Sequence, residues 1–356
     1  MVPTEESTKA NEQKQDATAP SITLPKGGGA IRGMGEKFAA NPVTGTGSMS
    51  IPIASSPGRS GFGPQLSLSY DSGAGNGPFG FGYHLSSPGI TRKTDKGLPK
   101  YRDTEESDVF ILSGAEDLVP ELVESNCKWK RKALPIRTVG CSQYRIQRYR
   151  PRIEGLFARI ERWTSQSDPS DTFWRSITRD NLITWYGKTA ESRITDPADP
   201  TRVFTWLICE SYDDKGNVIV YQYKEENGDG LDLCQANERN RTNQSRSANR
   251  YLKHIKYGNC TPYFPSLKAG ESLTPLPRDW LFEVVFDYGE HHPDSPTPSD
   301  TGIWTSRNDP FSTYRSGYEV RTYRLCQRVL MFHHFPDEPE VGTNCLVRST
   351  DFNYSY

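Results

Sequence analysis

The sequence predicts an all-β fold, mainly antiparallel, in which an extended, twisted or curved sheet is accompanied by few short helices. Short runs of β-branched and aromatic residues recur along the chain, each bounded by Gly, Pro, Asp or Asn. The 356 residues include 30 glycines and 26 prolines, which supply many turns. Only 34% of the residues are hydrophobic although 11% are aromatic, which favours strands whose faces are partly exposed to water.

Residues 1–20 are expected to form a disordered tail before a β-rich domain that spans residues 21–356. The tail has no aromatic residue and one β-branched aliphatic, Val2, so it cannot bury enough apolar surface to fold. It also lacks the apolar region of a conventional signal peptide. No stretch of the chain reaches the roughly 18 apolar residues of a membrane span. We therefore expect synthesis in the bacterial cytoplasm and no direct insertion into a membrane.

Seven strands are predicted most clearly. The segment "ESYDDKGNVIVYQY" at residues 210–223 reads as a strand, a tight turn at residues 214–217 and a second strand, with Gly216 in the left-handed position. Residues 235–255 have a composition that suits a helix but poor apolar spacing, so a short helix or an ordered loop is expected there. The predicted strands cover residues 48–53, 65–70, 107–112, 144–150, 182–187, 217–223 and 281–288.

A glycine motif raises the possibility of nucleotide binding. Gly75, Gly77 and Gly80 spell G-x-G-x-x-G directly after the strand-like "LSLSY". In a dinucleotide-binding loop a helix N-terminus must follow the glycines and face the pyrophosphate. Here Gly82 and the cluster "SSPG" leave no room for a helix, and no acidic residue stands where the ribose contact is needed. The glycines therefore predict a β-hairpin or bulged corner, with positive φ at Gly75 and Gly80, and no cofactor is expected.

Metal-binding patterns are weak. The pairs His291-His292 and His333-His334 are adjacent, and neighbouring side chains on a strand point to opposite faces. The segment "EENGDG" at residues 225–230 resembles the start of a calcium loop, but Ala236 stands at the twelfth position, where a bidentate Glu is required. No metal site is predicted.

The cysteines favour free thiols. An odd number with no C-x-x-C pair argues against a disulfide framework or a zinc ribbon. Buried, reduced thiols are expected, as in a protein made in a reducing cytoplasm. The seven cysteines lie at positions 127, 141, 209, 234, 260, 326 and 345.

Two further patterns are weighed as functional sites. Residues 128–162 hold eleven Lys or Arg against two Glu, with aromatic residues between them, which would suit single-stranded nucleic acid. Because the net charge of the chain is −1, the solvated side of a charged sheet is favoured and no nucleic acid is expected.

An ADP-ribosyltransferase would need an E-x-E motif together with an upstream Ser motif and an Arg. Glu338-Pro339-Glu340 supplies E-x-E, and Ser312-Thr313 and Arg307 lie upstream. Pro339 fixes φ in a turn that should be mobile, and Tyr314 replaces the second Ser of the motif. No catalytic residue is therefore predicted.

Long blocks of the chain resemble the SpvB/TcaC N-terminal domain, and the resemblance runs from about residue 21 to the end. The segment "YDDKGN" also resembles the YD repeat of RHS proteins. The blocks are "SITLPKGGGAIRGMGEKF", "NPVTGTGSMSIPI", "LSYDSGAGNGPFGFGYHLS", "ITRKTDKGLPKY", "DVFILSGAEDLVP", "TWLICESYDDKGNVIVYQY", "RSANRYLKHIKYGN" and "NDPFSTYRSGYEVRTYRLCQRVLMFHHF".

The resemblance implies a non-enzymatic structural role. It implies part of an RHS-type hollow shell in the B component of an insecticidal toxin complex, which is secreted and encloses a cytotoxic polypeptide. The implied partners are the C component with its cargo and, through a propeller expected downstream but absent here, the pore-forming A component.

Two alternatives stay open. The chain could be the N-terminal secretion or translocation domain of an SpvB-like ADP-ribosyltransferase whose catalytic domain is missing here. It could also be a stand-alone β-rich surface or carbohydrate-binding module.

Overall fold

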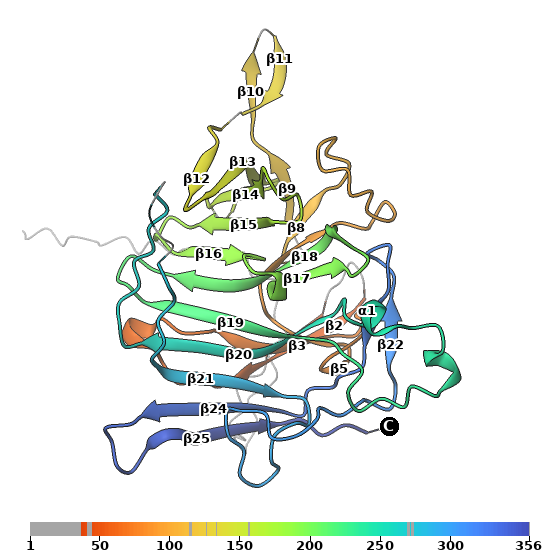
Figure 1. Ribbon diagram of the computed structural model, residues 1–356, viewed down its shortest axis with the longest axis vertical. Helices are drawn as coiled ribbons and strands as arrows, with labels where there is room; N and C mark the ends of the chain where they lie inside the picture. The colour runs from red at the N-terminus through yellow and green to blue at the C-terminus, as the bar shows by residue number, and fades with distance from the viewer. Residues whose placement is uncertain are drawn as a thin grey trace, which may run out of the picture.

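The computed structural model describes most of the chain and shows a fold built from strands (Figure 1). The predicted tail at residues 1–20 and the first block of the resemblance up to residue 36 lie outside the described residues. None of the helices within the described part is long and apolar enough to cross a membrane. The described residues are 37–40, 45–113, 116–125, 127–132, 134–155, 157–268, 271 and 274–355.

Eight antiparallel strands close into a ring because the long strand β18 pairs with strands from both ends of the series. The register joins β18 to β16 through Ile208 and Tyr186, and to β7 through Thr205 and Thr91. Around the ring the order is β7 (Gly89–Arg92), β8 (Phe110–Leu112), β9 (Glu116–Pro120), β13 (Ser142–Pro151), β14 (Arg159–Ser165), β15 (Thr172–Ile177), β16 (Ile183–Tyr186) and β18 (Asp199–Tyr212).

The inside of the ring is filled by side chains. Trp174 and Trp206 are completely buried at its centre, and Phe110 packs edge-on against both. Because side chains alternate along a strand, Trp163 and Trp185 point to the opposite face of the same strands. The interior cluster draws from all eight strands and contains Ile90, Phe110, Leu112, Leu118, Tyr149, Ile160, Trp174, Tyr186, Val203, Trp206 and Ile208.

Beyond β18 the same sheet continues as an open sheet. A small second sheet covers one of its faces, and the core between them includes Ile255, Tyr257 and Phe286. The open strands are β19 (Val218–Glu225), β20 (Arg250–Asn259), β21 (Trp280–Asp287), β24 (Arg328–Phe335) and β25 (Gly342–Asp351). The covering sheet contains β1 (Lys37–Ala40), β2 (Gly47–Ile53), β3 (Leu66–Asp71) and β6 (Tyr83–Leu85).

The remaining elements are short. Strands β12 (Arg137–Val139) and β17 (Arg193–Asp196) flank the ring, and three separate hairpins are made by β4 (Asn76–Gly77) with β5 (Gly80–Phe81), β10 (Leu122–Ser125) with β11 (Lys128–Arg131), and β22 (Phe311–Thr313) with β23 (Val320–Thr322). The helical turns are η1 (Arg59–Gly61), η2 (Ala190–Ser192), η3 (Ala236–Glu238) and α1 (Asn243–Arg246).

The predicted all-β fold is confirmed, and each of the seven predicted strands overlaps a strand of the structure. The turn before β19 is also confirmed. Gly216 has φ +83°, and the Asp213 carboxylate accepts hydrogen bonds from the backbone N–H groups of Lys215 and Asn217.

Two predictions were wrong in part. Residues 235–255 begin with short helical turns, but from Arg250 they form β20, because pairing with β19 and β21 outweighs local composition. The expected buried thiols are found only at Cys209 and Cys326, while Cys127, Cys141, Cys234 and Cys260 are exposed. Nothing in the spacing of the cysteines could have separated these two groups.

Candidate functional site

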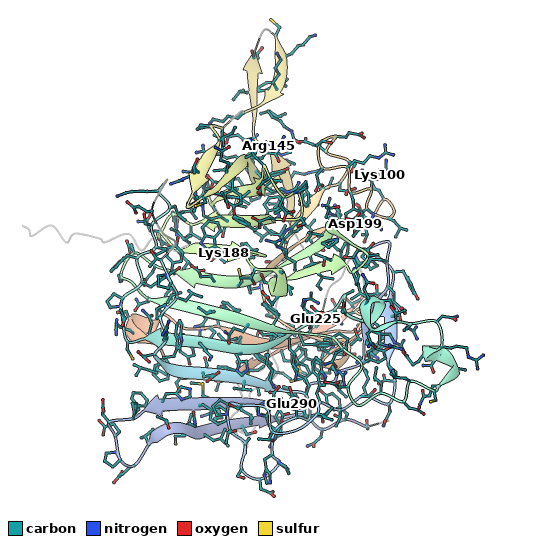
Figure 2. The ribbon with its side chains drawn as sticks, in the orientation of Figure 1. Lys100, Arg145, Lys188, Asp199, Glu225 and Glu290 are labelled. Atoms are coloured by element: carbon teal, nitrogen blue, oxygen red, sulfur yellow. The ribbon has the colours of Figure 1, made fainter. Side chains whose placement is uncertain are left out.

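A cavity of about 870 Å³, which we call the groove, opens on the face of the sheet opposite the ring core. Its floor is aromatic: Trp163 and Phe173 stack with ring centres 5.9 Å apart, and Trp185 packs edge-on against both. Lys188, which follows β16 (Figure 2), lines the cavity wall. Tyr263, from the loop after β20, lines the same wall. The floor residues are the outward-facing neighbours of the ring core, so the ring positions the groove.

Among the described residues, Glu210 is the only deeply buried carboxylate that lines the groove, and both of its oxygens accept hydrogen bonds from protein side chains. It accepts hydrogen bonds from the Tyr263 hydroxyl at 2.9 Å and from Lys188 Nζ at 2.7 Å. Burial, and then the charge of Glu210, raise the pKa of Tyr263 well above its usual range, so its hydroxyl remains a donor. Burial also raises the pKa of the neighbouring Cys209 thiol to about 11, which leaves it protonated at neutral pH. These groups hold one another in place.

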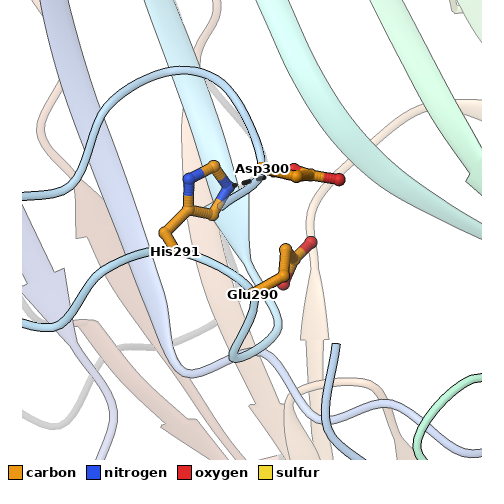
Figure 3. Close-up of side chains that lie close together, drawn as sticks. All are labelled: Glu290, His291 and Asp300. Carbon is orange, nitrogen blue, oxygen red and sulfur yellow. Dashed lines mark ion pairs between the residues drawn. The ribbon is translucent and has the colours of Figure 1, made fainter. Parts of the chain in front are cut away.

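A second cluster lies where the groove reaches the open sheet. Glu290 and His291 follow β21, and Asp300 ends the same loop; their ligand atoms all lie within 4.8 Å of one another (Figure 3). The ammonium group of Lys253, from β20, is 2.5 Å from Glu290 Oε1 and 3.1 Å from Asp300 Oδ1. It also lies 2.6 Å from His291 Nε2.

This cluster is balanced without a metal ion. Lys224 Nζ contacts Asp300 at 2.8 Å, so two ammonium groups face the two carboxylates of Glu290 and Asp300. A divalent cation would have to displace Lys253, which occupies the centre of the three ligands. The cluster is therefore an anchor for the loop at residues 288–301.

The His291 ring completes this anchor in its neutral form. Its Nδ1 lies 2.9 Å from the carbonyl oxygen of Thr297, to which it donates, while its Nε2 accepts from Lys253. Burial, and then the charge of Lys253, lower the pKa of His291. The pKa of Asp300 is also lowered: burial opposes this, but the hydrogen bond from Lys224 and the charge of Lys253 outweigh it.

The glycine motif forms the predicted hairpin. Asn76 pairs with Phe81 and Gly77 with Gly80, and no helix follows. Gly80 has φ +93°, but the expectation of a positive φ at Gly75 was wrong, because the hairpin turns two residues later.

The hairpin joins distant parts of the chain. Arg307 donates to the carbonyl oxygen of Gly77 at 2.8 Å and to the Asn76 side chain at 2.9 Å. The backbone N–H of Cys326 donates to the Pro78 carbonyl oxygen at 2.7 Å. Tyr354 lies so close to Gly80 that an added Cβ would be 3.1 Å from its ring. The motif is thus a structural junction.

The calcium-like segment is occupied by protein groups. Glu226 accepts from Arg324 Nε at 2.9 Å and from the Tyr251 hydroxyl at 2.5 Å. The second histidine pair behaves as strand alternation predicts: His333 contacts Ser56 at 2.6 Å, whereas His334 contacts Glu283 at 3.0 Å. Within the described residues, neither segment brings three or more potential metal ligands close together.

The transferase-like residues are not brought together. Arg307 is held by the glycine hairpin, and Ser312 in β22 donates to Glu319. The turn with Glu338 and Glu340 joins β24 to β25, on the other side of the molecule from β22 (Figure 1).

Many cations of the basic segment at residues 128–162 are neutralised. Arg162 contacts Asp103 at 2.5 Å and Lys132 contacts Glu121 at 2.8 Å. Arg159 pairs with Glu161, a carboxylate that also receives Arg175 at 2.7 Å. Glu161, Arg162 and Arg175 are buried, so their pairs lie inside the fold and not on the solvated side of the sheet that was predicted; Lys132 and Glu121 pair nearer the surface.

Sequence reasoning missed the groove and the Lys253 cluster. Lys253 lies 37 residues before Glu290, and only the pairing of β20 with β21 brings them together. His291 was considered only as one of an adjacent pair, and no local pattern links it to Lys253 or Asp300.

These observations define a β-sheet domain in which a filled ring and an open sheet share one long strand. The chain belongs to the SpvB family, described as Salmonella virulence plasmid 65kDa B protein, whose model matches residues 41–335. It is 40% identical over 319 residues to the mono(ADP-ribosyl)transferase SpvB of Salmonella typhimurium, covering 88% of this chain and 51% of the relative. The chain thus spans about half the length of the curated relatives it matches.

Solved structures show the same fold. The N-terminal domain of the effector protein SpvB from Salmonella typhimurium strain LT2 matches with a TM-score of 0.72 and 36% identity, over 86% of this chain and 98% of that domain. The TcdB2-TccC3 crystal structure matches with a TM-score of 0.74 and 35% identity, over 95% of this chain and 16% of that one. The Photorhabdus luminescens Tc holotoxin pore gives a TM-score of 0.75 at 35% identity, over 96% and 15%.

Proposed function

We propose that this chain is a non-enzymatic structural segment of a toxin-complex B-like virulence protein. Residues 21–356 would form one β-rich domain of a shell that encloses and delivers a cytotoxic polypeptide. The observation that carries the proposal is the likeness to the TcdB2-TccC3 structure over 95% of this chain. The closed, filled ring would supply rigidity, and the open sheet would connect to the rest of the shell.

The free edge of the open sheet supports this role. Strand β25 is ten residues long, and within the described residues it pairs only with β24. Its Leu346 and Val347 are 37% and 44% exposed. A long edge strand with exposed apolar residues is a template for another strand, which further shell strands would provide.

The proposed partners follow from the same likeness. They are a C component with its cargo and, through a propeller outside this chain, a pore-forming A component. The complex would act outside the bacterium.

A second candidate is favoured by the 40% identity to SpvB enzymes. In this case the chain would be the N-terminal secretion or translocation domain of an SpvB-like protein, and the transferase chemistry would reside elsewhere in that protein. Both candidates give this segment a structural role.

Sedimentation velocity and binding of the dye ANS test the shell proposal. With the β25 edge unpaired, the isolated chain should self-associate or bind ANS. Adding the remainder of a B component in cis, together with a matching C component, should remove both behaviours. The double variant Leu346→Lys/Val347→Lys should reduce self-association, whereas Ile303→Lys, at an exposed site that is not part of β25, should not. An ANS-silent, monodisperse wild type that melts cooperatively would instead favour the stand-alone module.

A further inference from the structure

The β10–β11 hairpin projects from the ring as a free ribbon (Figure 1). Its two strands pair with each other through four residue pairs and with no other strand of the described chain. An isolated two-stranded ribbon gains little stability in water. This ribbon is therefore a poor structural element by itself.

Apolar side chains are exposed on both faces of this ribbon. The register places Leu122 and Trp129 on one face, and Val123 on the other with Lys128 and Lys130. Trp129 is 69% exposed, Leu122 44% and Val123 37%. The ribbon therefore carries exposed apolar side chains on both faces, next to its two lysines.

The positive charge of the hairpin is concentrated toward its end. At the base, Arg131 pairs with Glu106, and Glu121 neutralises Lys132 at 2.8 Å. Lys128 and Lys130 have no ion-pair partner among the described residues. Glu124 is the one acidic residue within the two strands.

We propose that the β10–β11 hairpin adsorbs to an anionic lipid surface, with Trp129, Leu122 and Val123 entering the headgroup region and Lys128 and Lys130 contacting acidic headgroups. This inference goes beyond the shell role and concerns a different surface. Trp is suited to the boundary between water and lipid, and each Lys near an anionic surface adds attraction. The contact is adsorption and requires no crossing of the bilayer.

Lipid fits these side chains better than the other polyanions. Trp129 is the one exposed flat ring of the two strands on which a nucleic-acid base could stack, and Leu122 and Val123 offer none. A protein partner would need a broad, closely packed patch of roughly 800 Å² on this side, which a narrow two-stranded ribbon does not present. A projecting ribbon with apolar and cationic side chains can enter a soft headgroup layer from any direction.

Co-sedimentation of the full chain with vesicles tests the proposal. The protein should bind vesicles of phosphatidylcholine with roughly 30% phosphatidylserine and not vesicles of phosphatidylcholine alone. Binding should weaken steeply with added salt. Trp129→Ser and Lys128→Glu/Lys130→Glu should each weaken it by about tenfold or more.

Matched control variants distinguish binding by this hairpin from non-specific adsorption of the protein to vesicles. Ile303→Ser removes an apolar side chain that is 66% exposed elsewhere, and Lys215→Glu reverses an exposed charge in the β18–β19 turn. Both should bind like wild type, and all variants should retain the wild-type circular dichroism melt. Equal binding to both kinds of vesicle, or hairpin variants that bind like wild type, would overturn the proposal. So would hairpin-dependent binding of single-stranded DNA without vesicle binding.

Discussion

At the scale of single residues, the glycine motif shows how one spacing serves two different purposes. In a nucleotide-binding loop the glycines let a phosphate approach the backbone. Here the missing side chain of Gly80 lets the Tyr354 ring approach the backbone. The Tyr354 hydroxyl donates to the Cys326 carbonyl oxygen at 2.6 Å. The motif brings the hairpin next to the end of the described chain.

Gly80→Ala should therefore destabilise the protein. The new Cβ would lie 3.1 Å from Tyr354 at a residue with φ +93°, and the strain should cost about 1–3 kcal/mol of unfolding free energy. Gly75→Ala is the matched control, since its φ is not positive and a Cβ there meets no atom within 4 Å. Urea denaturation of both variants measures the difference. Equal stability of the two variants would contradict this account.

The glycine motif should also bind no nucleotide. Isothermal titration of the wild-type protein with NAD or ATP should therefore show no heat of binding.

At the scale of elements, the loop at residues 288–301 should make stability depend on pH. The folded state holds His291 neutral against Lys253, so its pKa is lower than in the unfolded chain, where it is about 6.5. Below that pH, His291 binds a proton in the unfolded chain but stays neutral in the folded chain. His291 therefore leaves the free energy of unfolding undiminished above about pH 6.5. Between that pH and the pKa of His291 in the folded state, the free energy of unfolding falls by at most about 1.4 kcal/mol per pH unit.

Denaturation at several pH values checks this, with His291→Gln as the informative variant. Gln retains an acceptor for Lys253 but does not titrate, so the slope between pH 6.5 and 5 should become smaller. Lys224, Asp287, Glu290 and Asp300 also face the ring of His291, and their charges remain in the variant. The exposed His84→Gln is the control and should keep the wild-type slope. Burial also lowers the pKa of His333, so this residue contributes to the slope that remains.

Local pattern predicted the elements better than their partners. Hairpin turns such as the one at Gly216 carry their own signal, because the glycine and the preceding Asp determine the geometry. Strand β20 was missed in part because its Tyr251 and Leu252 are both buried, which breaks the alternation that marks a strand. Lys253 and His291 meet through sheet pairing, and no spacing along the chain predicts such a contact.

At the scale of the whole molecule, the prediction of a curved sheet is confirmed, and the curvature closes a complete ring. Trp174 and Trp206 fill that ring, so any enclosed space of a larger shell would have to lie outside it. The family resemblance supplied the idea of a shell, whereas composition alone indicated only many short strands.

The isolated chain should not transfer ADP-ribose. Arg307, Ser312 and the Glu338–Glu340 turn are held in separate parts of the fold, so they cannot act on one substrate. Incubation with labelled NAD and cell lysate, including actin, is the assay, and an active transferase provides the positive control. Incorporation of label that Glu340→Ala abolishes would reverse this conclusion.

The closure of the ring by β18 also determines when this domain can fold. The hydroxyls of Thr91 and Thr205 meet at 2.9 Å although 114 residues separate them, so a long loop must close before the contact forms. Contacts between residues so far apart in the sequence slow folding, and the strand edges stay exposed until these contacts form. During synthesis, β7, β8 and β9 can pair with one another, but the second edge of β7 stays unpaired until β18 has emerged from the ribosome. A chain interrupted before residue 212 would then carry an open, association-prone sheet, and not a smaller folded unit.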